Sequence, residues 1–203
     1  MASQNPGTFF LHSLEENLRS QLQNWFSVGF VEMKEVTWNS PASLLERIIK
    51  YEAVHAIEGW ASLKQRLVGP GRRCFGFFHA SMEDEPLVFV EVALVDKIST
   101  SIQEVLQEDK YVKAAEAGGA QSGQFSPSTA IFYSISSTQA GLSGVDLGNF
   151  LIKQVVHRLH LEYPSINTFS TLSPLPGFLP YLFNKIGKVS SFFFFYIVAP
   201  TQT

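Results

Sequence analysis

One strand–loop–helix–strand unit in the second half of the chain constrains its fold more than any other feature. Residues 129–136 (TAIFYSIS) have the β-branched and aromatic character of a strand, and residues 166–172 are a second such run. A glycine-punctuated loop, 139–148, and a helical apolar pattern over residues 150–159 lie between them. Because strands joined through a helix run in the same direction, these two are predicted to form a parallel pair. Ligands of such units favour the carboxyl ends of the strands.

The remaining patterns predict further helices and two more strands. Capping residues mark helix starts at Ser13, Ser40 and Ser99. The predicted helices cover residues 13–26, 40–49, 60–67, 99–106 and 178–185, and the predicted strands cover 73–79 and 87–94. Residues 116–128 lack apolar periodicity and are expected to form a flexible loop. We therefore predict an α+β fold with a mixed, mostly antiparallel sheet flanked by helices.

Composition excludes several classes of protein. An apolar share of 45 % with 16 % charged residues excludes intrinsic disorder, and 203 residues allow one substantial core. A net charge of −3 gives no electrostatic footprint for nucleic acid. The longest apolar run, 192–199, is too short for a membrane span of roughly twenty residues and is predicted to be a buried strand. We expect an intracellular protein, because no targeting signal is recognisable and the single cysteine, Cys74, forms no intrachain disulfide.

The glycine loop has two interpretations. Gly141, Gly144 and Gly148 lead into a helix, where unpaired backbone N–H groups and the helix dipole favour a phosphate or pyrophosphate. The same glycines also fit ordinary turn and helix-packing positions. Their spacing matches neither the phosphate loop that ends in Gly-Lys-Ser/Thr nor the Gly-x-Gly-x-x-Gly pattern. Spacing alone therefore favours the structural interpretation.

The histidines and the cysteine are predicted to be structural residues. His157 and His160 are spaced to share one helix face, but the sequence offers no third ligand, so no metal site is predicted and both are expected to be solvated helix residues. His55 and His79 are expected to satisfy local hydrogen bonds. Cys74 lies in an apolar strand and is predicted to be an inert core thiol.

Ser173 stands where a strand ends against two prolines, in the sequence Leu-Ser-Pro-Leu-Pro-Gly over residues 172–177. A hydroxyl at this point is held rigidly and can project into a cleft at the carboxyl end of the sheet. A serine that initiates a turn has the same surroundings. From the residues alone, this structural interpretation is favoured.

A series of short strings identifies a family resemblance. In chain order they are Thr-Trp-Asn-Ser-Pro (37–41), Tyr-Glu-Ala-Val-His (51–55), Gly-Arg-Arg-Cys-Phe (71–75), Phe-Tyr-Ser-Ile-Ser (132–136), Gly-Val-Asp-Leu-Gly (144–148) and Leu-Ser-Pro-Leu-Pro-Gly-Phe (172–178). Together they closely resemble the malonyl-CoA decarboxylase family, from about Phe10 to Lys185. The resemblance implies a GNAT-type, acetyltransferase-like fold.

The resemblance also implies which residues form the site. In this family the loop before the central helix holds the CoA pyrophosphate on backbone amides. Carried over, the residues that bind malonyl-CoA are Ser143, Gly144, Val145, Asp146, Leu147, Gly148 and Asn149. The catalytic serine of the family matches Ser173, which also binds the substrate. Asp146 stands where the family usually has Glu.

The implied reaction converts malonyl-CoA to acetyl-CoA and CO₂ in fatty-acid metabolism. The thioester itself is the electron sink, so the resemblance implies no metal and no organic cofactor. Loss of CO₂ leaves an enolate, and Ser173 is expected to donate a hydrogen bond to the reacting malonyl group. A general acid then protonates the enolate carbon. In the family this acid is a histidine in an Asn-Pro-Val-Ala-Asn-Phe-His-like motif downstream of the serine.

The resemblance divides the chain unequally. Residues 1–187 are expected to be the amino-terminal portion of the catalytic domain, and residues 188–203 a divergent Phe-rich tail. The histidine motif and the helical domain through which the family forms homo-oligomers are expected to be missing. The alternative to an active decarboxylase is a non-catalytic CoA-binding or subunit-associating fragment; an acetyltransferase activity rests on fold analogy alone. The family implies a mitochondrial, peroxisomal or cytoplasmic location.

Overall fold

The computed structural model describes residues 6–107 and 125–186, and a five-stranded sheet lies at its centre. The strands, in spatial order, are β1 (Val31–Glu35), β2 (Arg72–His79), β3 (Pro86–Val95), β4 (Thr129–Ser137) and β5 (Thr168–Thr171). The first four pair antiparallel with their neighbours, and β5 pairs with β4 in parallel. The predicted α+β class, the mixed sheet and the parallel pair are confirmed. The expected strand over 192–199 and most of the expected loop over 116–128 lie outside the described residues.

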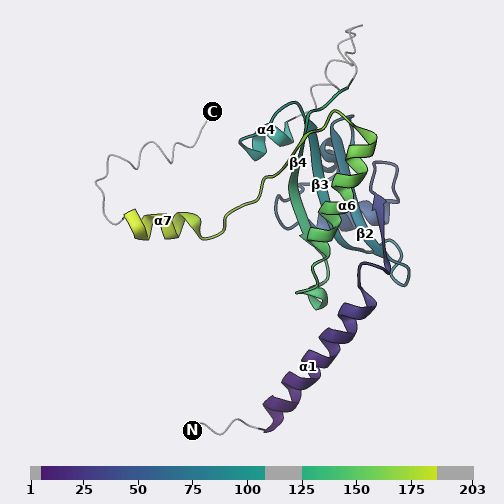
Figure 1. Cartoon of the computed structure of the whole chain (residues 1–203), viewed down its shortest axis with the longest axis vertical. Coiled ribbons are helices and arrows are strands. Elements are labelled where there is room, and N and C mark those ends of the chain that lie inside the picture. Colours follow the sequence, from purple (N-terminus) through teal and green to yellow (C-terminus); the bar gives the residue numbers. More distant parts are fainter. Residues whose placement is uncertain (1–5, 108–124, 187–203) are drawn as a thin grey trace. The chain divides into compact units, whose positions relative to one another are not determined.

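Helices cover both faces of the sheet. The described helices of the chain are α1 (Pro6–Trp25), α2 (Ala42–Tyr51), α3 (Trp60–Leu67), α4 (Ile102–Leu106), the short 3₁₀ helix η1 (Ala140–Leu142), α6 (Leu147–Glu162) and α7 (Phe178–Ile186). Helix α6 lies along one face and buries Leu151, Val155 and Leu159 against it (Figure 1). Helices α2 and α3 bury their apolar sides in a second cluster with Cys74 and Phe89. Within 6–107 and 125–186, no helix is both long and apolar enough to cross a membrane.

The chain forms two compact units. Met1–Leu172 contains the sheet and most of the helices, and Ser173–Thr203 contains α7. Helix α7 covers the helix predicted over 178–185, so that prediction is confirmed.

Strand β1 was not predicted from the sequence. Half-buried Val31 and Met33 alternate with exposed Glu32 and Lys34, which is the pattern of a strand with one face covered. The run is only five residues long, and such a short alternation does not stand out from a loop without its partner β2.

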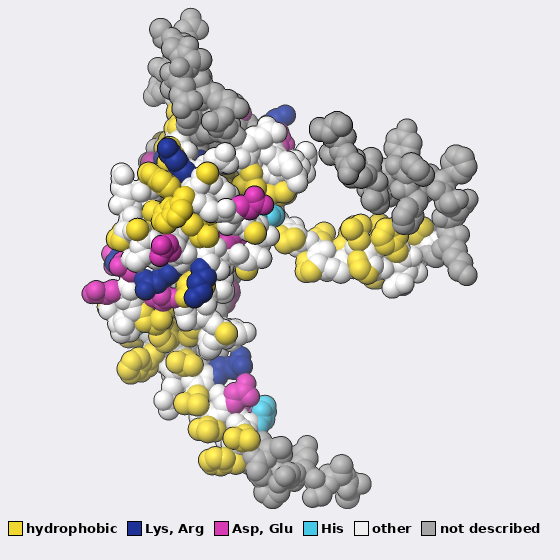
Figure 2. Space-filling model, turned by 180° about the vertical axis from the view of Figure 1, so that it is seen from behind, with side chains coloured by type: hydrophobic (Ala, Val, Ile, Leu, Met, Phe, Trp, Pro, Cys, Tyr) yellow, Lys and Arg dark blue, Asp and Glu magenta, His cyan; other side chains and the backbone are white. Residues whose placement is uncertain are grey.

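Helix α1 begins earlier than predicted. It starts at Pro6 rather than at Ser13, because proline is well suited to the first helical turn. Leu14, Leu18 and Leu22 share a face, as their spacing predicts, but all three are exposed. Figure 2 shows hydrophobic side chains gathered along this helix, at the lower end of the view. The packing predicted for this face is therefore absent from the part of the chain that the structure describes.

Two other predicted caps are displaced. The hydroxyl of Ser40 accepts a hydrogen bond from the N–H of Thr37 at 3.0 Å, and α2 begins after Pro41 without a side-chain cap. Helix α4 is capped by Ser101 rather than Ser99, through the N–H of Glu104 at 3.2 Å. Serine competes for nearby backbone groups in turns as well as at caps, so its position alone does not locate a helix start.

An ion pair is buried between α3 and β3. Arg66 Nη1 lies 2.8 Å from Glu91 Oε2, and the two side chains are 3 % and 0 % exposed. The other terminal nitrogen of Arg66 donates to the carbonyls of His55 and Ala56 at 2.8 and 3.1 Å. Glu91 Oε1 has no hydrogen-bond partner. Burial raises the pKa of Glu91 to about 7, against the opposing effect of Arg66.

This raised pKa predicts a pH dependence of folding. Between its ordinary value near 4.5 and about 7, the native chain keeps a proton on Glu91 that the unfolded chain has lost, so stability falls as pH rises. We expect the free energy of unfolding of the wild-type chain to fall by about 3 kcal/mol across this pH range, relative to that of the Glu91→Gln variant. Urea unfolding at several pH values measures the difference. Glu46→Gln, an exposed change on α2, is the control and should track the wild type. A constant difference between wild type and Glu91→Gln contradicts the prediction.

Candidate functional site

The loop that opens α6 is anchored by its apolar side chains. Leu147 is buried in the core, and Leu142 and Val145 pack against the same cluster half-buried. Ser143, Gly144 and Asp146, which lie between these apolar residues, are exposed. After Leu147, Gly148 is half-buried and Asn149 is exposed. The loop therefore has one side fixed to the core and a polar side facing outward. All seven residues that the resemblance assigns to substrate binding lie on this one segment.

The backbone N–H groups of the loop divide into two sets. Those of Ser143, Val145 and Leu147 donate within the loop, to the carbonyls of Ala140, Leu142 and Val145 at 2.8–3.1 Å. The N–H groups of Asp146, Gly148 and Asn149 belong to the first turn of α6, where the helix itself offers no acceptor. This set carries the positive end of the helix dipole and is suited to an anion.

Asp146 does not cap this helix. It occupies the N-cap position, but its side chain makes no capping hydrogen bond to a backbone N–H. Its Oδ2 accepts a hydrogen bond from the side-chain amide of Asn149 at 3.2 Å instead. The first turn of α6 is therefore open at its start, which is uncommon for a helix preceded by an aspartate.

Gly144 and Arg19 shape the outer side of the loop. Gly144 has φ +90°, a conformation that side-chain-bearing residues rarely adopt. Arg19 of α1 donates from Nη1 to the carbonyl of Ser143 at 2.9 Å, and its Nη2 lies 3.2 Å from Glu15. A guanidinium is thus held beside the loop by the backbone and by one acidic neighbour.

Strand β4 continues beyond its parallel partner. The β4–β5 register ends at Phe132 and Thr171, followed by one hydrogen bond from the N–H of Leu172 to the carbonyl of Phe132 at 2.9 Å. Residues 134–137 remain paired with β3 on the other side, and Tyr133 is left out of the register. A register shift in that pairing, beside Glu91, marks the point where the two parallel strands separate. This end of β4 leads directly into η1 and the glycine loop.

Ser173 lies two residues after Thr171, where the β5 ladder ends. Leu172, between them, packs against the small buried cluster that contains Ile131 and Tyr133, and Ser173 is the first, exposed residue of the second unit. The structure thus gathers the seven predicted loop residues on one segment of the first unit, and it describes Ser173 with the second unit.

The remaining sequence-predicted candidates take structural places. His157 and His160 are exposed on α6, as predicted. His79 Nδ1 lies 2.6 Å from the hydroxyl of Ser81, which confirms a local hydrogen bond, whereas the buried Nε2 of His55 has no partner. Cys74 is fully buried, and burial raises its pKa well above the ordinary value, as expected of an inert core thiol. Among the described residues, no group of three potential metal ligands occurs.

One buried polar cluster was missed by sequence reasoning. Glu52, Ser134 and Ser136 are all buried, and the hydroxyls of both serines donate to the carboxylate of Glu52. The two serines alternate with apolar residues in a strand that is otherwise apolar, which was a usable signal. Their shared partner was not visible, because it lies far away in the chain.

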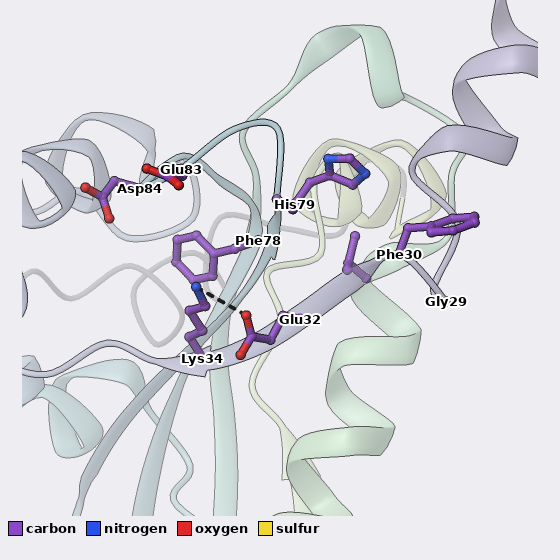
Figure 3. A pocket seen from close by; sticks show the side chains of 10 residues that line it. Gly29, Phe30, Glu32, Lys34, Phe78, His79, Glu83 and Asp84 are labelled. Atoms are coloured by element: carbon purple, nitrogen blue, oxygen red, sulfur yellow. Dashed lines mark ion pairs between the residues drawn. The ribbon is translucent and has the colours of Figure 1, made fainter.

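A separate hollow lies beside the edge strand β1. It has a volume of about 520 Å³ and is lined by residues of the segment 29–34 and of the turn between β2 and β3. Figure 3 shows Lys34 beside Glu32, an ion pair of 3.2 Å, with the ring of Phe78 next to the ammonium group. His79 lines this hollow, whereas Ser173 and the seven loop residues 143–149 do not.

Comparison with protein families gives one match. Residues 29–193 match the family described as "Malonyl-CoA decarboxylase C-terminal domain". The chain is 46 % identical over 174 residues to the mitochondrial malonyl-CoA decarboxylase of Anser anser anser, and 47 % identical over 165 residues to that of Mus musculus. These alignments cover 86 % and 81 % of this chain but 32 % of each relative. The chain therefore spans about a third of the length of these relatives.

Solved structures give a similar result. A malonyl-CoA decarboxylase from Agrobacterium vitis superposes with a TM-score of 0.76 and 40 % identity, over 89 % of this chain and 44 % of that one. The protein of the same description from Rhodopseudomonas palustris gives a TM-score of 0.70 and 40 % identity, over 89 % and 42 %.

Replacing two glycines of the loop by alanine is expected to have different effects on stability. Gly144→Ala forces a side chain onto a backbone with positive φ and is expected to cost about 1–2 kcal/mol of unfolding free energy. Gly148→Ala places its new methyl group at an ordinary 3.4 Å from Ile135 and is expected to be neutral or slightly stabilising, since alanine favours helices. Urea unfolding of both variants checks this. Equal losses in the two contradict the conformational argument.

Proposed function

This chain belongs to the malonyl-CoA decarboxylase family, and from that premise we propose that it binds malonyl-CoA and contributes to its conversion into acetyl-CoA and CO₂. In this proposal Ser143, Gly144, Val145, Asp146, Leu147, Gly148 and Asn149 bind the CoA pyrophosphate, and Ser173 is the catalytic serine. Because the chain spans only part of its relatives, each of these assignments is a proposal for this chain.

The observation that carries the proposal is the open amino-terminal turn of α6. The N–H groups of Asp146, Gly148 and Asn149 have no acceptor within the helix, and the side chain of the N-cap residue Asp146 does not cap the helix. A pyrophosphate supplies the negative oxygens that these donors and the helix dipole favour. The positive φ of Gly144 supports the same assignment, because it lets the backbone approach the ligand without an intervening side chain.

The end of β4 supports a CoA substrate rather than a simple phosphate. Residues 133–137 lie beyond the β5 ladder, so one side of β4 presents backbone groups without a strand partner there. The pantetheine arm of CoA is an extended chain with amide groups, which is suited to pair with such an edge as a strand does. This edge leads directly into the loop assigned to the pyrophosphate. In CoA the pantetheine arm is likewise joined directly to the pyrophosphate, so the edge and the loop can bind adjacent parts of one ligand.

Ser173 is assigned to the chemical step. Breaking the bond between the carboxylate and the central carbon of the malonyl group releases CO₂ and leaves the bonding electrons in an enolate of the thioester. A hydroxyl donor to the reacting malonyl group stabilises the charge that develops. A proton added to the enolate carbon completes acetyl-CoA, and no metal or organic cofactor enters this balance. We do not assign the proton donor to His157 or His160, which are exposed on α6.

The cellular location of this chain is also part of the proposal. The two relatives named above are described as mitochondrial, and we propose a mitochondrial location for this chain on that basis.

The assignment of Ser173 is tested by turnover. We expect Ser173→Ala to lower the formation of acetyl-CoA from malonyl-CoA by about 10²–10³-fold, the usual cost of one hydrogen-bond donor to a developing oxyanion. Binding of CoA itself should be unchanged, because the nucleotide end contacts the loop. Ser170→Ala is the matched control: this serine lies on β5, and its hydroxyl makes a long hydrogen bond of 3.4 Å to the carbonyl of Thr171. It should retain wild-type turnover.

Three outcomes distinguish the alternatives. Turnover that survives in Ser173→Ala contradicts the catalytic assignment. A folded wild-type chain that binds CoA without turnover identifies a CoA-binding portion of the family fold, the second function kept open above. A folded chain that binds no CoA contradicts the proposal as a whole.

A further inference from the structure

Glu52 is the centre of a buried hydrogen-bond network at the end of α2. Its carboxylate accepts the hydroxyl of Ser134, which lies 2.6 and 2.7 Å from the two oxygens, and the hydroxyl of Ser136 at 3.1 Å. It also accepts the backbone N–H groups of Val54 and His55 at 2.9 and 2.8 Å. Glu52 is 9 % exposed. A single carboxylate thus joins the segment after α2 to strand β4.

Both serines lie on the stretch of β4 that has left β5. The parallel ladder ends at Phe132, and Ser134 and Ser136 follow it. The hydroxyl of Ser136 also accepts a hydrogen bond from the N–H of Ala53 at 3.1 Å. Ser136 therefore both donates to and accepts from the segment after α2. Where backbone hydrogen bonds to β5 end, side-chain hydrogen bonds to Glu52 take over in holding the strand.

The geometry of β4 directs its free backbone groups to the open edge. The N–H of Thr138 bonds to the carbonyl of Leu87 on β3, and the register makes Ser136 and Ser134 the next residues that face β3. Backbone groups alternate in an antiparallel pair, so those of Ile135 and Ser137 point the other way. Ile135 also lies under the start of α6, 3.4 Å from the position of a Cβ on Gly148.

From this arrangement we propose that Glu52 is a positioning residue that holds the open edge of β4 for the pantetheine arm of CoA. The proposal rests on the function proposed above. Glu52 touches no substrate in this assignment. It fixes the positions of Ser134 and Ser136, and these two residues in turn fix the backbone of their neighbours Ile135 and Ser137. Removing its charge leaves two hydroxyls and two N–H groups with a weaker acceptor, and this end of β4 then loses its set position.

The test separates the two ends of CoA. Isothermal titration of the full chain measures affinity for CoA and for its nucleotide end alone, phosphoadenosine diphosphate. The ratio of the two affinities reports what the pantetheine arm contributes. We expect Glu52→Gln to weaken the affinity for CoA by about tenfold, a typical effect of one charge-assisted hydrogen bond. The affinity for the nucleotide end alone should be unchanged. A loss of stability alone does not change this ratio.

Two further variants keep the test decisive. Ser136→Ala removes the hydroxyl shared by Glu52 and Ala53 and should lower the ratio in the same direction, even where Glu52→Gln does not fold. Ile48→Val, a fully buried change in the same helix, is the control for lost stability and should keep the wild-type ratio.

The outcomes distinguish this inference from the proposed function. A wild-type chain that binds CoA, with Glu52→Gln or Ser136→Ala variants that keep the wild-type ratio, overturns the positioning role and leaves the proposed function standing. Parallel losses for CoA and nucleotide overturn it too, since they indicate general damage to the site. A folded wild-type chain that does not bind CoA overturns both.

Discussion

The short parallel ladder between β4 and β5 is the constraint on which the rest of the structure depends. The two strands pair over four residues and then separate, while β4 keeps its pairing with β3 to its end. A longer ladder would have covered the edge of β4 that precedes the glycine loop. The separation exposes that edge, sends the chain into the loop that opens α6, and places Ser173 just after the last bond between the strands.

A strand that loses one ladder needs another source of support. On the α2 side, Glu52 supplies it through Ser134 and Ser136. Next to this network lies the buried pair of Arg66 and Glu91, which holds the segment after α2 through the carbonyls of His55 and Ala56. Buried charges are costly unless they are paired and hydrogen-bonded. Here the charged groups of Glu52, Arg66 and Glu91 connect the irregular segment after α2 to the centre of the sheet. Apolar packing alone does not fix the position of such a segment as closely, because it has no direction.

Much of the fold was predictable because its signals are local. The crossover from β4 through α6 to β5, the strands β2 and β3, and the buried Leu151, Val155 and Leu159 follow from apolar periodicity. That a glycine loop leads into α6 was also predictable, since the glycines and the following apolar periodicity lie together in the sequence, whereas the assignment of Ser143–Asn149 to substrate binding came from the family resemblance. Helix starts were less certain. Ser13 and Ser99 have the chemistry of caps, but α1 begins at Pro6 and Ser101 caps α4, because serine also occurs in helix interiors and turns and does not by itself locate a helix start.

By itself, the sequence determined the fold class, the family and the position of the glycine loop, since these depend on residues that are adjacent or regularly spaced. Only the tertiary structure decided what joins distant segments. It brought Glu52 to serines more than eighty positions away and paired the short strand β1 with β2. It also ended the β5 ladder at Phe132 and left the first turn of α6 uncapped. Hydrogen bonds between such segments depend on where the packed sheet brings them, and no local pattern encodes that position.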